Sequence, residues 1–429
     1  MKTYTYTESI NQLDKLLKRD EGENLKIRQQ VLSIIDTVQS SGDKALYTYT
    51  EKFDGCTLDA LRVTDTEIQA AFETIGSEMV AIIEEAAGNI RRFHEKQCET
   101  TWMYHPEPGI TLGQHITAIE RVGLYVPGGK AAYPSTVLMD SIPAIVAGVD
   151  SLVMVTPPSK DGTINPHILA AAKIAGVHEI YKVGGAQAIA ALAYGTESIR
   201  PVNKIVGPGN IYVATAKKEV FGKVAIDMIA GPSEVLILSD GNANPVFAAA
   251  DLLSQAEHDE MAMPILVTTD AAFGKKVVDE VYRQIDADLS RKEIAKKSVD
   301  QYGFVFITDT LDQAFELSNA IAPEHMEILL PEPMKYLEKV RNAGAIFFGA
   351  YTPEPLGDYF AGPNHTLPTS GTAKFSSPLG VYDFIKKSSI LSYSEEALKS
   401  VYPKIAAFAR SEGLDAHAKS VERRFEKGE

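Results

Sequence analysis

The chain has little cysteine and no long apolar segment. Only Cys56 and Cys98 occur among 429 residues, and they do not form a Cys-x-x-Cys motif. A disulfide framework and a cysteine-rich zinc site are therefore excluded. No apolar run reaches the ~20 residues that a membrane-spanning helix needs, and residues 1–7 lack the apolar core of a signal peptide. We therefore expect a cytoplasmic protein that does not enter a membrane.

Positive charge is scarce as well. The chain carries 42 Lys and Arg against 57 Asp and Glu, which gives a formal net charge of -15. General binding to nucleic acid is not expected, because it needs a cationic surface. The hydrophobic fraction of 45% and the charged fraction of 23% are ordinary for a globular protein with a sizeable core. The length predicts two or three domains of ~100–200 residues each.

Between about residues 123 and 206, short β-rich runs alternate with alanine-rich helical stretches. Such alternation is typical of a parallel sheet that carries helices on both faces. The expected strands span 123–126, 151–156, 178–183 and 204–206, and the expected helices span 136–149, 166–175 and 187–193.

A second alternating series occupies about residues 234 to 349. The first hundred residues are expected to be mainly helical, and Thr64 and Glu67 form the capping-box pattern that opens one helix. Residues 395–425 are expected to form a polar helical segment. The expected strands of the second series span 234–239, 264–268, 304–308 and 345–349, and its helices about 244–258, 270–287, 310–320 and 332–342.

Two successive series of this kind predict an α/β fold with two Rossmann-like doubly wound domains and small helical N- and C-terminal elements. The last of these elements lacks a core of its own, so we expect it to pack on another domain or another subunit. The expected division is an N-terminal arm at 1–24, a first α/β domain at 25–120 plus 234–372, a second Rossmann-like domain at 121–233, and a C-terminal tail at 373–429.

Four glycine-rich turns lie at the ends of expected strands. Glycine allows a phosphate to approach the backbone, and ligands of open α/β sheets bind where such turns lie. None of the turns completes a Gly-x-Gly-x-x-Gly fingerprint, because Tyr212 occupies the third glycine position after Gly207 and Gly209. A nucleotide site and a set of tight turns therefore both remain open. The turns span 126–129, 183–187, 206–210 and 230–233.

Gln255 and His258 are three residues apart in an expected helix, so their side chains project from one face. An imidazole nitrogen and an amide oxygen aimed at one point can bind a divalent metal such as zinc or manganese. Glu324 and His325 add two groups that can move protons near neutral pH.

Four further polar residues extend this set, although each also has an ordinary structural explanation. Asp358 lies in a turn-like context where a carboxylate can be a helix cap, and His365 lies in a loop. Glu412 and His417 lie in the tail. Residue types alone support a mixed nitrogen and oxygen site. The remaining histidines are interpreted as structural: His94, His105, His115, His167 and His178.

Taken together, the motifs resemble the histidinol dehydrogenase family. Six of them occur in order, and the similarity extends from about residue 25 to the C-terminus. The motifs that carry the resemblance are Gly123–Gly129, Val183–Ala193, Gly207–Asn210, Ala230–Leu236, Ser254–His258 and Pro323–His325.

The resemblance implies an enzyme that oxidises L-histidinol to L-histidine in two NAD-dependent steps through the aldehyde, the final step of histidine biosynthesis. It also implies one zinc ion per subunit and an intertwined homodimer in which Glu412 and His417 reach the active site of the other subunit. Glu324 and His325 would be the catalytic pair.

The implied binding residues fall into three groups. The zinc ligands would be Gln255, His258, Asp358 and His417. The cofactor would be held by Tyr125, Gln187 and Asn210. The substrate would contact Ser233, Gln255, His258, Glu324, His325, Asp358, His365, Glu412 and His417.

Three alternatives remain at this stage. A related NAD-dependent dehydrogenase on the same scaffold would oxidise another small alcohol, such as a sulfonated diol. A thiol mechanism would use Cys56 or Cys98, which lie away from every glycine turn. A non-enzymatic binding protein would show no NAD reduction with any alcohol. The preferences for zinc over manganese and for NAD over NADP rest on the resemblance.

Overall fold

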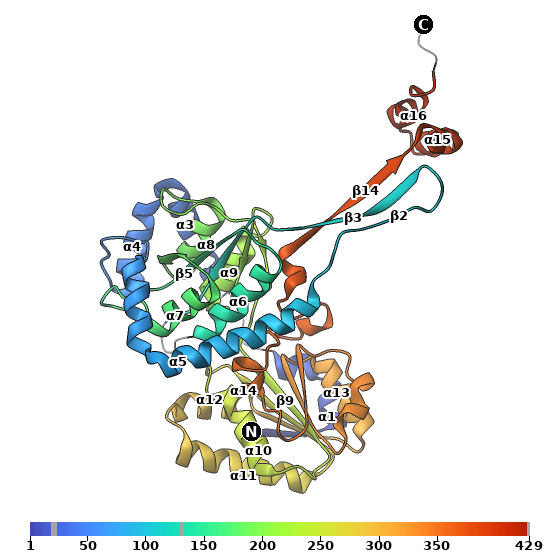
Figure 1. The fold of residues 1–429 in the computed structure, drawn as a ribbon. Helices are drawn as coiled ribbons and strands as arrows, with labels where there is room; N and C mark the ends of the chain where they lie inside the picture. Colours follow the sequence, from blue (N-terminus) through green and yellow to red (C-terminus); the bar gives the residue numbers. More distant parts are fainter. Residues whose placement is uncertain (19–23, 129–132, 427–429) are drawn as a thin grey trace. The chain divides into compact units, whose positions relative to one another are not determined.

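The computed structural model describes residues 1–18, 24–128 and 133–426, and it forms two compact units (Figure 1). The large unit comprises Met1–Gln97 and Ile119–Phe384, and the small unit comprises Cys98–Ala118 and Ile385–Glu429. Gly129 of the first predicted glycine turn and residues 19–23 of the predicted arm lie outside the described residues. Within the described ranges, no helix combines the length and apolar character required to cross a membrane.

The large unit contains a five-stranded parallel sheet in the order β6-β5-β4-β7-β8. From β4 the chain winds outward to β5 and β6, and it then returns to add β7 and β8 on the other side. The strand order therefore reverses between β4 and β7, the position where open α/β sheets bind ligands. The strands are β4 (Arg121–Tyr125), β5 (Ser151–Thr156), β6 (Glu179–Lys182), β7 (Lys204–Val206) and β8 (Ala225–Ile226).

A six-stranded parallel sheet follows in the order β1-β11-β10-β9-β12-β13, with a second reversal between β9 and β12. Two doubly wound parallel sheets confirm the predicted fold class. The strands are β1 (Lys2–Thr5), β9 (Glu234–Ser239), β10 (Met263–Thr268), β11 (Phe304–Ile307), β12 (His325–Leu329) and β13 (Ala345–Phe348).

Helices cover both sheets, and apolar residues of the helices and strands form the core. Those packed on the five-stranded sheet are α3 (Asn24–Ser41), α4 (Asp43–Asp54), α5 (Asp65–His94), α6 (Pro134–Val146), α7 (Pro166–Ala175), α8 (Gly185–Tyr194) and α9 (Ile211–Val220). Those of the six-stranded sheet are α1 (Tyr6–Ile10), α2 (Leu13–Leu17), α10 (Pro245–Ala256), α11 (Ala271–Asp288), α12 (Lys292–Tyr302), α13 (Leu311–Ile321) and α14 (Glu354–Tyr359).

The predicted grouping of residues 25–120 with 234–372 is wrong for the N-terminal helices. Val31 of α3 belongs to the same core as Ile189 of α8, and Ile90 of α5 belongs to the same core as Leu138 of α6. The helices therefore cover the five-stranded sheet. An amphipathic pattern shows that a helix has an apolar face, but not which sheet that face covers.

The two chain ends contain the predicted helices, and the helical prediction for residues 395–425 is confirmed, but each end also contains a strand that was not predicted. Residues 2–5 form the edge strand β1, which pairs in parallel with β11. In the small unit, β14 (Ile385–Tyr393) pairs antiparallel with β3 (Ile110–Ala118), which also pairs with β2 (Trp102–Tyr104). The predicted tail at 373–429 is thus divided, because residues 373–384 belong to the large unit. Two more helices complete the small unit: α15 (Glu395–Ser411) and α16 (Asp415–Glu422).

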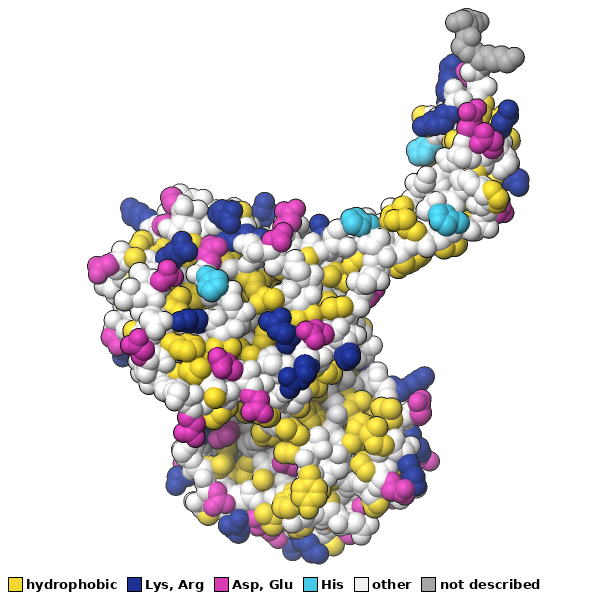
Figure 2. Space-filling view, in the orientation of Figure 1, with side chains coloured by type: hydrophobic (Ala, Val, Ile, Leu, Met, Phe, Trp, Pro, Cys, Tyr) yellow, Lys and Arg dark blue, Asp and Glu magenta, His cyan; other side chains and the backbone are white. Residues whose placement is uncertain are grey.

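The surface carries charges of both signs in close alternation. On the face shown in Figure 2, basic and acidic side chains are interspersed.

Candidate active site

Several predicted site residues lie together at the amino edge of the six-stranded sheet. Because α10 follows β9 and runs back along the sheet, its last turn lies beside the starts of the strands. Gln255 and His258 occupy that end of the helix, Ser233 precedes β9, and Glu324 and His325 lie at the start of β12.

The end of α10 presents two metal-binding groups. The Nδ1 of His258 donates to the Ser254 carbonyl oxygen at 2.8 Å, which leaves Nε2 as the ligand atom. Gln255 is only 2% exposed. Its amide is satisfied when Nε2 donates to Glu354 Oε1 at 2.7 Å and to Oε2 at 3.1 Å. The Gln255 Oε1 is then directed away from Glu354.

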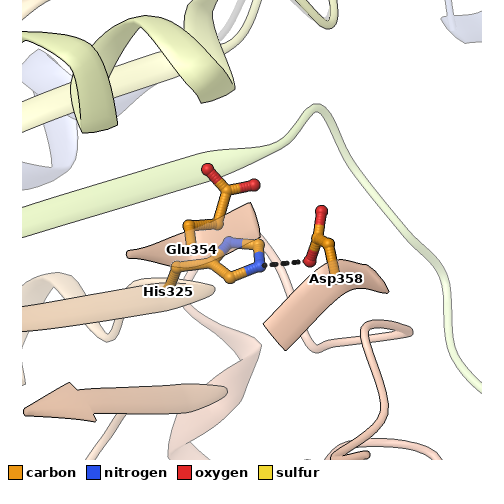
Figure 3. Close-up of side chains that lie close together, drawn as sticks. All are labelled: His325, Glu354 and Asp358. Atoms are coloured by element: carbon orange, nitrogen blue, oxygen red, sulfur yellow. Dashed lines mark ion pairs between the residues drawn. The ribbon is translucent and has the colours of Figure 1, made fainter. Parts of the chain in front are cut away.

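His325 is buried and has one nitrogen without a hydrogen-bond partner. Its Nδ1 donates to the Glu234 carbonyl oxygen at 2.9 Å. Its Nε2 has no partner among the described residues, and it lies 3.6 Å from Asp358 Oδ1 (Figure 3). In the neutral imidazole, Nε2 is therefore a proton acceptor that faces the site.

The carboxylates around His325 determine its charge. Burial alone would lower the pKa of His325, but Glu324 and Asp358 outweigh burial and raise that pKa well above its ordinary value. Burial likewise would raise the pKa of Asp358, but the nearby imidazole of His325 holds it below its ordinary value. A divalent cation bound at Asp358 would offset the negative charge that favours the protonated imidazole.

Glu324 has the pKa of a general base that works near neutral pH. Its Oε2 accepts a hydrogen bond from the Glu234 N–H at 2.8 Å, and it lies 3.7 Å from His325 Nδ1. Burial raises the pKa of Glu324 to about 7, although His325 and the Glu234 N–H oppose the shift. Near that pH a carboxyl group can both take up and release a proton.

His365 lies in the same electrostatic neighbourhood. Burial lowers the pKa of His365 below its ordinary value, while the charge of Asp358 opposes this effect. Its Nε2 has no hydrogen-bond partner among the described residues. The segment that carries it is held by Asn364, whose Nδ2 donates to the Met139 carbonyl oxygen of α6 at 2.6 Å.

The structure adds Glu354, which the sequence analysis missed. One ligand atom each from His325, Glu354 and Asp358 lies within 4.8 Å of the others, so these three groups could hold a metal ion. Glu354 precedes Asp358 by four residues in α14, and the two project from one helix face. That spacing is the signal that would have identified Glu354 in the sequence.

Two more buried carboxyl groups, Asp251 and Glu327, lie behind Glu354. The Glu354 N–H donates to Glu327 Oε1 at 2.8 Å. Burial raises the pKa of Asp251, Glu327 and Glu354, and repulsion from Asp251 and Glu354 adds to the shift of Glu327. Neighbouring carboxyl groups in such a setting favour their protonated forms, because adjacent buried carboxylates repel each other.

The predicted cofactor residues Tyr125 and Gln187 meet at the carboxyl edge of the five-stranded sheet. The Tyr125 hydroxyl, at the end of β4, accepts a hydrogen bond from the Gly185 N–H at 3.1 Å. A Cβ on Gly185 would lie only 2.7 Å from Gln187 Oε1, and Gly185 has a φ of +64°. Gln187 Oε1 is buried without a partner in the described part of the chain. A bound ligand could supply the missing donor.

Asn210, the third predicted cofactor residue, is the N-cap of α9. Its Oδ1 accepts from the Tyr212 and Val213 N–H groups at 3.0 and 3.2 Å, and the residue is exposed. The cap places an exposed helix N-terminus directly after β7, beside the reversal of strand order. Helix N-termini at such positions attract phosphate groups.

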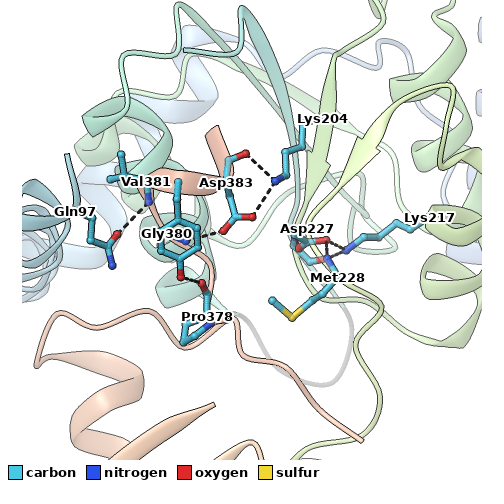
Figure 4. Close-up of polar contacts among 11 residues, drawn as sticks. Gln97, Lys204, Lys217, Asp227, Met228, Pro378, Gly380, Val381 and Asp383 are labelled. Carbon is cyan, nitrogen blue, oxygen red and sulfur yellow. Dashed lines mark hydrogen bonds and ion pairs between the residues drawn. The ribbon is translucent and has the colours of Figure 1, made fainter. Parts of the chain in front are cut away.

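A buried ion pair holds the turn that precedes Asn210. Lys217 and Asp227 pair inside the protein (Figure 4). Lys217 Nζ also donates to the Gly207 carbonyl oxygen at 2.9 Å, and the Gly207 N–H donates to Asp227 Oδ2 at 2.8 Å. Both backbone groups of Gly207 are thus bound, at a φ of +116° that favours glycine.

Asp140 lies between the segment that carries His365 and the Gly207 turn next to the predicted cofactor residues. Its Oδ1 accepts from Thr366 Oγ1 at 3.1 Å, next to His365. Its Oδ2 has no partner among described residues, and it would lie 2.9 Å from a Cβ on Gly207. Burial, with repulsion from Asp227, raises the pKa of Asp140 well above its ordinary value. Burial therefore favours the protonated form of Asp140 in the folded protein.

Glu412 and His417 belong to the small unit. Glu412 is the C-cap of α15 and His417 lies in α16, and both side chains are exposed. Their predicted place in the active site stays a prediction.

The thiol alternative is disfavoured. Cys56 is buried, and burial, with the charge of Asp54, raises the pKa of its thiol. A raised pKa reduces the thiolate fraction that a nucleophile needs. Cys98 is exposed and belongs to the small unit.

Comparison with known proteins identifies close relatives. Residues 17–425 match the family model described as histidinol dehydrogenase. The chain is 57% identical over 402 residues to histidinol dehydrogenase of Geobacillus kaustophilus, and the aligned region covers 94% of this chain and 95% of that protein. It is 54% identical over 410 residues to the Clostridium acetobutylicum protein of the same name, at 96% and 95% coverage. The crystal structure of histidinol dehydrogenase from Elizabethkingia anophelis superimposes with a TM-score of 0.93 at 39% identity, covering 99% of this chain and 98% of that one.

We expect Asp140→Asn to stabilise the protein at pH 8 by on the order of 1–3 kcal/mol, because the neutral amide does not have to take up a proton when the protein folds. Folding raises the pKa of Asp140. The free energy of unfolding therefore falls as the pH rises from the pKa of Asp140 in the unfolded chain towards its pKa in the folded protein. The benefit should therefore shrink towards pH 4. Urea midpoints at both pH values would measure it, with the exposed Asp150→Asn as a matched control. A lower midpoint for Asp140→Asn at pH 8 would contradict a protonated Asp140.

Proposed function

The chain belongs to the histidinol dehydrogenase family, and on that premise we propose that it oxidises L-histidinol to L-histidine in two NAD-linked steps through the aldehyde. The observation that carries the proposal is the buried His325, whose Nε2 has no hydrogen-bond partner among the described residues and lies 3.6 Å from Asp358 Oδ1, while its Nδ1 lies 3.7 Å from Glu324 Oε2. The alternative substrate, another small alcohol such as a sulfonated diol, has no support among the reported relatives, which are named histidinol dehydrogenase.

The side chains present fit a zinc ion. We propose Gln255, His258 and Asp358 as ligands from the large unit, because the first two present an oxygen and a nitrogen from one helix end and Asp358 adds a carboxylate. When bound, zinc would hold the imidazole and amine of histidinol and so position its carbinol carbon. Ser233 and His365 would complete the substrate pocket.

NAD would bind at the carboxyl edge of the five-stranded sheet, where the strand order reverses between β4 and β7, and it would accept a hydride in each step. Tyr125 and Gln187 line that edge, and the unpartnered Gln187 Oε1 can accept a hydrogen bond from the cofactor. The positive end of the α9 dipole, next to Asn210, suits a pyrophosphate.

His325 and Glu324 would divide the proton transfers. His325 takes the hydroxyl proton at Nε2 in the first oxidation, because its Nδ1–H is committed to the Glu234 carbonyl oxygen. Glu324 then takes a proton from the water that adds to the aldehyde, and it can do so near neutral pH since its pKa is about 7. The hydrate formed in this way is the substrate of the second hydride transfer.

We also propose a homodimer in which Glu412 and His417 of the partner subunit complete the site. The small unit exposes several large apolar side chains, as expected for a surface that is covered by a partner: Trp102, Met103, Tyr104, Leu391 and Phe408. The cytoplasmic location remains a prediction.

The first test is NADH formation at 340 nm from L-histidinol with the purified full chain. We expect two NADH per histidinol, loss of activity after removal of metal with a chelator, and recovery when zinc is restored. Absence of turnover by zinc-loaded protein would contradict the proposed substrate. Activity that survives complete metal removal would contradict the role of zinc.

Glu324→Gln should separate the two oxidations. The amide cannot take a proton from water, so we expect oxidation of the aldehyde to fall about 10²- to 10⁴-fold while oxidation of histidinol is retained within about tenfold. In the unaltered chain, the second step should rise with pH through about 7 as Glu324 ionises. Single-turnover assays started from histidinol and from the aldehyde would measure both, with the exposed Glu84→Gln as control. Equal loss of both steps would rule out this division of roles.

Complementation between two inactive variants would test the shared site. His258→Asn and His417→Asn should each abolish most activity as homodimers. A co-expressed mixture should regain roughly a quarter of full activity, because half of the dimers are mixed and each has one intact site. Co-expression of His258→Asn with the exposed His178→Asn gives the matched comparison. A mixture of the first two that stays inactive would show that each site is built within one subunit.

A further inference from the structure

The buried carboxylate of Glu354, a residue of α14, links this helix to α10. Glu354 is 1% exposed and is the first residue of α14. Its N–H is bound to Glu327 Oε1 at 2.8 Å, so the backbone at this position is anchored to β12. Its carboxylate faces the other way, towards the last turn of α10.

Two donors from α10 converge on that carboxylate. Ser254 Oγ donates to Glu354 Oε2 at 2.5 Å, and the Gln255 amide nitrogen donates to Oε1 at 2.7 Å and to Oε2 at 3.1 Å. In its ionised form, which a bound divalent cation would favour, the Glu354 carboxylate only accepts hydrogen bonds, whereas an amide has one donating and one accepting end. With Gln255 only 2% exposed, water cannot readily substitute for this partner.

We propose that Glu354 is the positioning residue that orients the Gln255 amide, so that its oxygen rather than its nitrogen faces the metal site. Only the oxygen has a lone pair for a divalent cation, since the amide nitrogen donates hydrogen bonds. This inference rests on the proposed function, in that it assumes a metal bound by Gln255. It assigns Glu354 an indirect role, although its carboxylate also lies close enough to His325 and Asp358 to suggest direct ligation.

The surrounding contacts favour the indirect role. Both oxygens of Glu354 already accept hydrogen bonds from α10, while the Nε2 of His325 has no hydrogen-bond partner among the described residues and lies 3.6 Å from Asp358 Oδ1. Partners of this kind, which orient a metal ligand from behind, typically alter metal affinity about 10- to 100-fold when they are removed.

Metal affinity of the full chain, measured without substrate, tests the proposal. Zinc affinity would be measured by competition with a chromophoric chelator, and cobalt(II) would report the ligand geometry by its visible absorption. We expect Glu354→Leu to weaken zinc binding about 10- to 100-fold. Glu354→Gln should stay within about threefold, because its amide oxygen still accepts from Gln255. Glu327→Gln, which removes a buried carboxylate one contact further away, is the matched control and should bind zinc normally.

A double-variant cycle separates orientation from direct ligation. If Glu354 acts through Gln255, Glu354→Leu adds no further loss of zinc affinity in a Gln255→Ala background. A further loss in that background, or a Glu354→Gln variant as weak as Glu354→Leu, would overturn the proposal in favour of direct ligation. Unchanged zinc affinity in Glu354→Leu would overturn it as well.

If Glu354→Leu does not fold, a second set of variants tests the proposal by exchanging the amide of Gln255 and the carboxylate of Glu354. Gln255→Glu alone sets two carboxylates against each other, so zinc binding should weaken even though a carboxylate is a good zinc ligand. Combined with Glu354→Gln, the donor-acceptor pair is restored in the opposite direction and affinity should recover. Normal zinc affinity in Gln255→Glu alone would overturn the proposal. Because these assays contain no histidinol, failure of the proposed substrate would leave their outcome unaffected.

Discussion

The active site depends on the parallel pairing of β9 with β12 across the reversal of strand order in the six-stranded sheet. In this register His325 lies opposite Val235. The Glu234 peptide is thereby placed between the two catalytic candidates, where its N–H binds Glu324 and its carbonyl oxygen binds His325. The backbone N–H and carbonyl of this one residue thus support the Glu324 carboxylate and set the protonated nitrogen of the His325 imidazole, so a shift of this register would displace both.

The two sheets contribute opposite edges. Tyr125 and the Gly207 turn lie at the carboxyl edge of the five-stranded sheet, the usual place for a ligand in an open α/β fold. The catalytic candidates lie at the amino edge of the other sheet, where the start of β12 and the end of α10 supply side chains. Asp140 joins these regions through Thr366, and the Gly231 N–H is bound to Thr369 Oγ1 at 2.6 Å. The segment 364–369 therefore connects the cofactor turn with the imidazole of His365.

Sequence periodicity predicted most elements of both parallel sheets, because buried strands and covering helices differ in length and apolar spacing. It missed β12, whose strand character comes from its central position between β9 and β13. It also missed the antiparallel pairing of β3 with β14, since residues so far apart in sequence leave no local sign of their contact. The predicted helix at 332–342 is a 3₁₀ helix at Pro333–Lys339, held by short-range turns.

The sequence by itself determined which chemical groups are available: the Gln255 and His258 pair at one helix face, the adjacent Glu324 and His325, and the glycines of the turns. The residues of each pair are close in sequence, so they lie close together in any fold that keeps α10 and β12. Only the tertiary structure decided which atoms are free to react. Which nitrogen of His325 is occupied, which end of the Gln255 amide is exposed, and which carboxyl groups are protonated all depend on burial and on partners distant in the chain, such as Glu354.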